Sequence, residues 1–208
     1  MDNTHIRQLT ASKLESLGIP LNPNLPLLEH LKRRPIFDIV NRLVVEYALT
    51  GLANEASPKK LFSWIKEIGI KDATTSRDRH FLSKRPTGQQ EIDLSWRKER
   101  LIALVWSGGI IESLPFPSRD DQLDSIFPLI PPEVELHSFR ENFEPRSSEE
   151  LSCALDFYLC LHSAYRHPEI WENQGRETLP ISLIRERRTA LEWICYRDLE
   201  IDDIALDT

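Results

Sequence analysis

The chain has 208 residues, of which 40% are hydrophobic and 28% are charged. An apolar share of this size excludes a wholly disordered chain, and the length suits one large domain or two small ones. No run approaches the roughly 18 apolar residues of a transmembrane helix. Residues 1–17 hold no apolar stretch typical of a secretory signal. The three cysteines are an odd number, which in the absence of a signal favours a reducing compartment. We therefore expect a cytoplasmic protein with no membrane span.

The net charge of −7 is unevenly distributed along the chain. Residues 1–107 carry 17 basic and 12 acidic side chains, whereas residues 108–208 carry 9 and 21. The negative net charge argues against general nucleic-acid binding, since that binding needs a basic face. Two interpretations of the asymmetry stay open. Either the two halves attract each other across one interface, or the acidic half offers a surface to a basic partner.

Helix signals follow one another through the first half of the chain. Apolar spacing, capping residues and glycine stops predict helices over residues 4–17, 36–50, 58–68, 75–83 and 94–107. Residues 20–35 hold four prolines and cannot form a regular helix. Residues 84–92 are polar and are predicted to form a loop. Residues 101–106 are apolar on every side, which predicts that this segment is buried.

The second half opens with a segment rich in proline and acid, residues 113–135, with one short helix predicted near 119–127. Ser147 and Glu150 have the spacing of a capping box and predict a helix that runs to about Tyr165. This helix is nearly apolar all round, so we expect it to be central. A last helix is predicted over residues 180–196.

These elements predict an all-α fold: a compact, single-domain bundle of about seven helices over residues 1–208. Proline-rich loops at 20–35 and 113–135 are expected to connect the helices. Motifs for a metal site, a phosphate-binding loop or a serine nucleophile are absent from the sequence. We therefore expect no metal and no cofactor, assign no catalytic residue, and favour a protein that is not an enzyme.

Two arginines stand out in the last predicted helix. At 100° per residue, Arg187 and Arg188 fall within its apolar arc, and a buried arginine is costly unless it is paired. Paired with Glu99 or Asp156, they would form buried salt bridges; left open, they would form an anion pocket. We favour the salt bridges. His162 also lies on an apolar face, where a hydrogen-bonded core residue is a more common role than a ligand or base.

Three blocks of sequence, in order, cover most of the chain. They are Trp96–Glu99 with Ala103–Trp106, Arg146–Leu151 leading to Asp156–Tyr158, and Arg187–Trp193 followed by a terminal Asp207-Thr208. Together they resemble the bacterial domain-of-unknown-function family 4272. Ile201 departs from that pattern, because the family usually has tryptophan there.

The resemblance implies a compact helical domain of bacterial source and implies no activity. It adds weight to four charged residues that match family positions, namely Glu99, Arg187, Arg188 and Asp207. Charged residues that a family keeps on apolar helix faces form either an ion-pair framework or a site.

Two functions follow from these features. The first is a non-enzymatic protein-binding module, such as an inhibitor or immunity-type partner of a basic protein, with no role in binding nucleic acids or membranes. Its expected contact surface is acidic and consists of Asp120, Asp121, Asp124, Glu133 and Glu135. The alternative is a small-molecule-binding protein or enzyme with an arginine–carboxylate pocket. Arginines in an open cleft would favour this alternative, and arginines closed by carboxylates would favour the first function.

Overall fold

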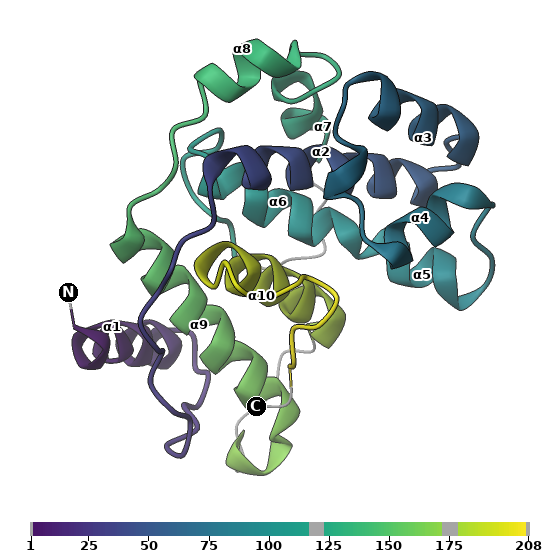
Figure 1. The fold of residues 1–208 in the computed structure, drawn as a ribbon. Coiled ribbons are helices and arrows are strands. Elements are labelled where there is room, and N and C mark those ends of the chain that lie inside the picture. The colour runs from purple at the N-terminus through teal and green to yellow at the C-terminus, as the bar shows by residue number, and fades with distance from the viewer. Residues whose placement is uncertain (1, 117–122, 172–178, 207–208) are drawn as a thin grey trace. The chain divides into compact units, whose positions relative to one another are not determined.

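The computed structural model describes residues 2–116, 123–171 and 179–206 (Figure 1). These residues form α-helices and short 3-10 turns, and they contain no strand. The prediction of an all-α fold is confirmed. The helices are α1 Asn3–Ser16, α2 Ile36–Ala53, α3 Pro58–Glu67, α4 Ser76–Ser83, α5 Gln89–Ser95, α6 Arg97–Ser107, α7 Leu123–Ile126, α8 Leu136–Glu141, α9 Ser148–Arg166 and α10 Ile181–Cys195.

The described helices fall into two units. One unit contains α1, α9 and α10, and the other contains α2 to α8. The proline-rich residues 20–33 belong to the first unit. The single domain over residues 1–208 stays a prediction.

Helix α9 is the centre of the first unit. Ser147 and Glu150 form the expected capping box, in which each side chain accepts the other residue's backbone N–H. Both α1 and α10 pack against α9, and its side chains from Leu155 to Tyr165 are all buried. Figure 1 shows α9 in green with α1 in purple and α10 in yellow beside it.

The proline-rich segment of this unit is held by side chains from α1 and α9. Asn22 donates a hydrogen bond to Ser163 Oγ at 3.0 Å, and the amide of Asn3 donates to the Leu28 carbonyl at 2.6 Å. Residues 20–30 contain no helix, as their prolines predict. Side-chain donors therefore replace the backbone ladder that a helix would have provided.

Helix α2 is the centre of the second unit. It packs against α3, α4, α5, α6 and α8, and nearly all of its residues from Ile39 to Leu52 are buried. Residues 101–106 of α6 are also buried, which confirms their prediction from an all-apolar sequence. Gly108 ends α6 where a Cβ atom would lie only 2.1 Å from the Phe143 ring, so the close approach at this turn requires glycine.

The predicted boundaries are wrong in two places. Residues 84–92 were predicted to form a loop, but α5 begins at Gln89, because Gly88 with φ 58° turns the chain into a run of good helix formers. The helix predicted over 94–107 is therefore two helices, which meet at Trp96. Helix α8 was not predicted from the sequence. It is a short helix whose N-terminus is capped by the Glu135 carboxylate.

Candidate functional site

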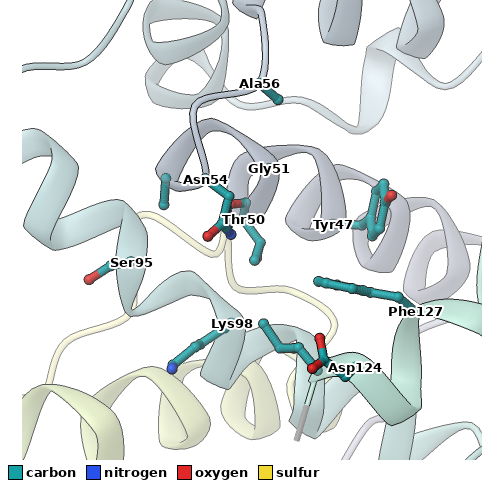
Figure 2. A pocket seen from close by; sticks show the side chains of 11 residues that line it. Tyr47, Thr50, Gly51, Asn54, Ala56, Ser95, Lys98, Asp124 and Phe127 are labelled. Atoms are coloured by element: carbon teal, nitrogen blue, oxygen red, sulfur yellow. Dashed lines mark hydrogen bonds between the residues drawn. The ribbon is translucent and has the colours of Figure 1, made fainter. Parts of the chain in front are cut away.

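A pocket of about 440 Å³ opens in the second unit between α2, the start of α6 and the α7 region (Figure 2). This volume lies in the range of small-molecule sites, roughly 300–1,000 Å³. The described lining residues are Tyr47, Thr50, Gly51, Ala53, Asn54, Ala56, Ser95, Lys98, Leu123, Asp124 and Phe127.

Several polar groups of the pocket are already bonded to their own helices. Thr50 donates to the Glu46 carbonyl at 2.8 Å, Asn54 donates to the Thr50 carbonyl at 3.0 Å, and Ser95 donates to the Ile92 carbonyl at 2.7 Å. The Tyr47 hydroxyl makes no hydrogen bond to any described residue, and Asp124 is exposed. These two groups are the oxygens best placed to meet a ligand.

One end of the pocket is aromatic and acidic. The Tyr47 ring meets Phe127 edge to face at 5.4 Å and Trp64 at 5.9 Å. Burial, and the negative charge of Glu133, raise the pKa of Tyr47 above its ordinary value. Tyr47 therefore stays a neutral phenol at neutral pH, in a region of negative potential.

A buried cluster of charged side chains lies next to the pocket residues of α2 and α6. The Glu46 carboxylate accepts hydrogen bonds from Arg42 at 2.6 Å and from Arg97 at 3.1 Å, and Arg100 Nη1 lies 3.8 Å away. Arg42 also donates to Asp78 at 2.6 Å. The cluster ties α2 to α4 and α6, and thereby fixes Tyr47 beside Glu46 and Lys98 beside Arg97.

The charges in this cluster stabilise one another. Burial alone would raise the pKa of Asp78, but Arg42, Arg97 and the backbone N–H of Thr75 hold it well below its usual range. Burial alone would lower the pKa of Arg42, but Glu46 and Asp78 raise it above its usual value. Asp78 and Arg42 therefore stay charged, and the cluster is a framework of ion pairs between its own side chains.

Sequence reasoning missed this cluster, although one signal was available. Arg42 and Glu46 lie four residues apart on a helix that is otherwise almost wholly apolar, and that spacing places them side by side. A charged pair inside an apolar stripe indicates a buried ion pair. The partners Asp78 and Arg97 could not be identified in the same way, since they lie 36 and 51 residues from the side chains that they meet.

Arg187 and Arg188 are buried, as their places on the apolar arc indicate. Arg187 donates to the Tyr158 hydroxyl at 2.7 Å. Arg188 donates to Glu192 at 2.7 Å and to His162 Nδ1 at 2.8 Å. Neither arginine is among the described residues that line the pocket.

The predicted partners of these arginines are Asp156, Glu99 and Asp207. Asp156 is bound by Arg7, whose Nε and Nη2 donate to it at 2.8–3.1 Å. Glu99 is buried on α6 in the other unit. Asp207 lies outside the described residues. A contact of Arg187 or Arg188 with Glu99 or Asp207 stays a prediction.

His162 is a hydrogen-bonded core residue. Because arginine only donates, Nδ1 must accept from Arg188, and the proton of the neutral ring then lies on Nε2. Burial, together with Arg188, Arg166 and Arg185, lowers the pKa of His162 to about 3. A ring with this pKa is neutral at physiological pH and does not act as a general acid there.

This lowered pKa predicts a loss of stability in acid. The unfolded His162 takes up a proton near pH 6.5 and the folded one only near pH 3, so the unfolded chain binds more protons in between. The free energy of unfolding should therefore fall as pH falls through this window, by up to about 1.4 kcal/mol per pH unit. Urea unfolding between pH 7.5 and pH 4.5 measures this slope.

The matched variant is His162→Asn, which keeps an acceptor near the position of Nδ1 but does not titrate. Its free energy of unfolding should decline less steeply with acid than that of the unmodified chain. Equal slopes for the two proteins would show that His162 protonates equally in the folded and unfolded states.

The five acids of the predicted contact surface divide into two groups. Asp124 lines the pocket, and Glu133 and Glu135 are exposed on the segment that follows η2 Phe127–Leu129. Asp120 and Asp121 lie outside the described residues. The structure therefore places one predicted acid in the pocket and a second, Glu133, near enough to act on Tyr47.

Comparison with known proteins identifies a family for this chain. The family model for a domain of unknown function, DUF4272, matches residues 7–204. The chain belongs to this family. No curated protein and no solved structure matches the chain. Membership of DUF4272 therefore brings no activity with it, and any function has to be argued from the residues.

Two structural findings narrow the possible sites. None of the described helices is both long and apolar enough to cross a membrane. Within the described ranges, histidine, cysteine and carboxylate side chains nowhere gather in threes at metal-binding distance.

Proposed function

We propose that this protein is a non-catalytic module that binds a basic protein partner, in the manner of an inhibitor or immunity-type protein. One observation carries the proposal: exposed carboxylates lie at the acidic, aromatic end of the pocket. They are Asp124, in the pocket lining, and Glu133, whose charge acts on Tyr47. Glu135, exposed two residues further along the chain, is a third carboxylate, and it also accepts a hydrogen bond from the backbone N–H of Ser138. Complementary charge of this kind steers a partner of opposite sign.

The hydrogen bonds of Arg187 and Arg188 favour a protein-binding function over a small-molecule site with an arginine–carboxylate pocket. Arg188 is held by Glu192 and His162, and Arg187 is 3% exposed and bonded to Tyr158. A substrate anion would have to displace these partners before it reached either guanidinium. The exposed carboxylates meet no such obstacle.

The test measures association of the full chain with a basic probe peptide that contains arginine and lysine. The control probe has the same length, with citrulline in place of arginine and glutamine in place of lysine. We expect the basic probe alone to bind, with an association rate that falls as salt shortens the Debye length from about 10 Å at 0.1 M to about 3 Å at 1 M. The triple variant Asp124→Asn, Glu133→Gln, Glu135→Gln should associate more slowly.

A variant with the same change in net charge controls for non-specific attraction. It carries Glu15→Gln, Glu67→Gln and Glu91→Gln, three exposed acids on α1, α3 and α5. This control should bind like the unmodified chain. Equal slowing by both triple variants would contradict a localised surface. Unchanged binding in the first variant would contradict the proposed surface whatever its stability, because Glu135→Gln also weakens the cap of α8.

A further inference from the structure

The pocket has the chemistry that a guanidinium group requires. A cation gains energy over the face of an aromatic ring, and the rings of Tyr47 and Phe127 both line the cavity. The Asp124 carboxylate lies in the same lining, and Figure 2 shows it beside Phe127 and on the opposite side of that ring from α2. A carboxylate next to an aromatic ring can bind a guanidinium group, because the planar guanidinium donates hydrogen bonds to the carboxylate while its face stacks on the ring.

The charges around the cavity favour a cation at this end. Asp124 and Glu133 are both acidic, and Glu133 acts electrostatically on Tyr47. Lys98 is a cation in the described lining. In Figure 2 its side chain extends away from Asp124 and Phe127, toward the end of the pocket at Ser95. The cavity is therefore polarised, with its acidic and aromatic groups together at one end.

From this arrangement we propose that the pocket receives an arginine side chain of the basic partner, against Phe127 and Asp124, with the Tyr47 ring packed on Phe127. The inference rests on the proposed function and adds the anchor residue that the pocket recognises. The guanidinium would donate to Asp124 and lie against the Phe127 ring, which the Tyr47 ring supports edge to face.

Three probe peptides that differ at one central position test this assignment. The position carries arginine, lysine or citrulline, and all three peptides keep the same flanking basic residues. Citrulline has the shape of arginine without its charge, so it isolates the contribution of the cation. We expect the arginine peptide to dissociate slowest and the citrulline peptide to dissociate roughly fivefold faster or more, as loss of one exposed charge pair and one ring contact implies.

Variants of the pocket separate the ring from the carboxylate. Tyr47→Leu should speed dissociation of the arginine peptide more than Tyr47→Phe, which keeps the ring and loses only the hydroxyl. Asp124→Asn should speed dissociation without loss of the fold, because Asp124 is exposed. Circular dichroism checks that each variant folds. If Tyr47→Leu fails to fold, Phe127→Leu and Asp124→Asn decide the question.

Lys98→Gln is expected to have the opposite effect on binding of the arginine peptide. Removal of this cation should tighten binding of the arginine peptide, because it removes a repulsive charge from the lining. Weaker binding in Lys98→Gln would instead indicate an anionic or zwitterionic ligand and would overturn the assignment of arginine.

The rates distinguish failure of the inference from failure of the proposed function. Surface charges act mainly on association, and a filled pocket acts on dissociation. If Glu133→Gln with Glu135→Gln slows association, but arginine and citrulline peptides dissociate alike, the basic-partner function stands and the arginine pocket is wrong. If no basic peptide binds better than its neutral analogue, both are wrong.

Discussion

Glu46→Gln is expected to lower the free energy of unfolding by roughly 3–5 kcal/mol, the cost of breaking a fully buried ion pair. The Glu46 side chain is 0% exposed and accepts hydrogen bonds from Arg42 and Arg97. Glutamine has the same shape but no charge, so the arginines would keep their positions and lose their main counter-ion. Urea unfolding at pH 7 measures the loss.

The matched control is Asp38→Asn, which removes one carboxylate charge from an exposed position on the same helix. It should change the free energy of unfolding by less than about 0.5 kcal/mol. The difference in the free energy of unfolding between Glu46→Gln and Asp38→Asn should persist at high salt, because salt screens exposed charges far more than buried ones. A loss for Glu46→Gln that equals the control would show that the cluster is not a stabilising framework.

This cluster also bears on the pocket. Glu46 and Tyr47 are neighbours on α2, and Arg97 and Lys98 are neighbours on α6, so each buried charge fixes the helix turn that carries a pocket residue. Partial loosening in Glu46→Gln should therefore weaken peptide binding even where the protein remains folded. The buried charged cluster and the pocket therefore depend on the same turns of α2 and α6.

The features that the sequence predicted well depend on local signals. The capping box at Ser147 and Glu150 acts within one turn and marked the start of α9. The all-apolar run of α6 predicted its own burial, because no polar face remained to meet water. Proline excluded helix from residues 20–30 for an equally local reason, the missing N–H.

The features that it missed depend on contacts between distant residues. Asp156 was predicted as a possible partner of Arg187 or Arg188, and its contact with Arg7, 149 residues away along the chain, could not be inferred from spacing. The pocket likewise joins α2 to the α7 region, and no spacing rule relates Tyr47 to Asp124. The acidic composition of residues 108–208 pointed to Asp124 and Glu133, but it could not indicate an aromatic cavity beside them.

Arg7→Ala is expected to be the second most destabilising change, at roughly 3–5 kcal/mol at neutral pH. Arg7 binds Asp156, which is 1% exposed, and donates to the carbonyls of Leu25 and Pro26 at 2.9 Å and 2.8 Å. One side chain thus connects α1, α9 and the proline-rich segment. Its removal would leave a buried carboxylate without a counter-ion and two carbonyls without their donor.

Asp156→Asn should lower the free energy of unfolding by less than Arg7→Ala does. The reason is that the two side chains differ in burial. Arg7 is 12% exposed and can turn its charge toward water once its partner is neutral, whereas Asp156 has no such route. Urea unfolding of both variants at pH 7, with the exposed neighbour Gln8→Ala as control, measures this difference. A larger loss for Asp156→Asn than for Arg7→Ala would contradict the assignment of Asp156 as the buried member that needs its partner.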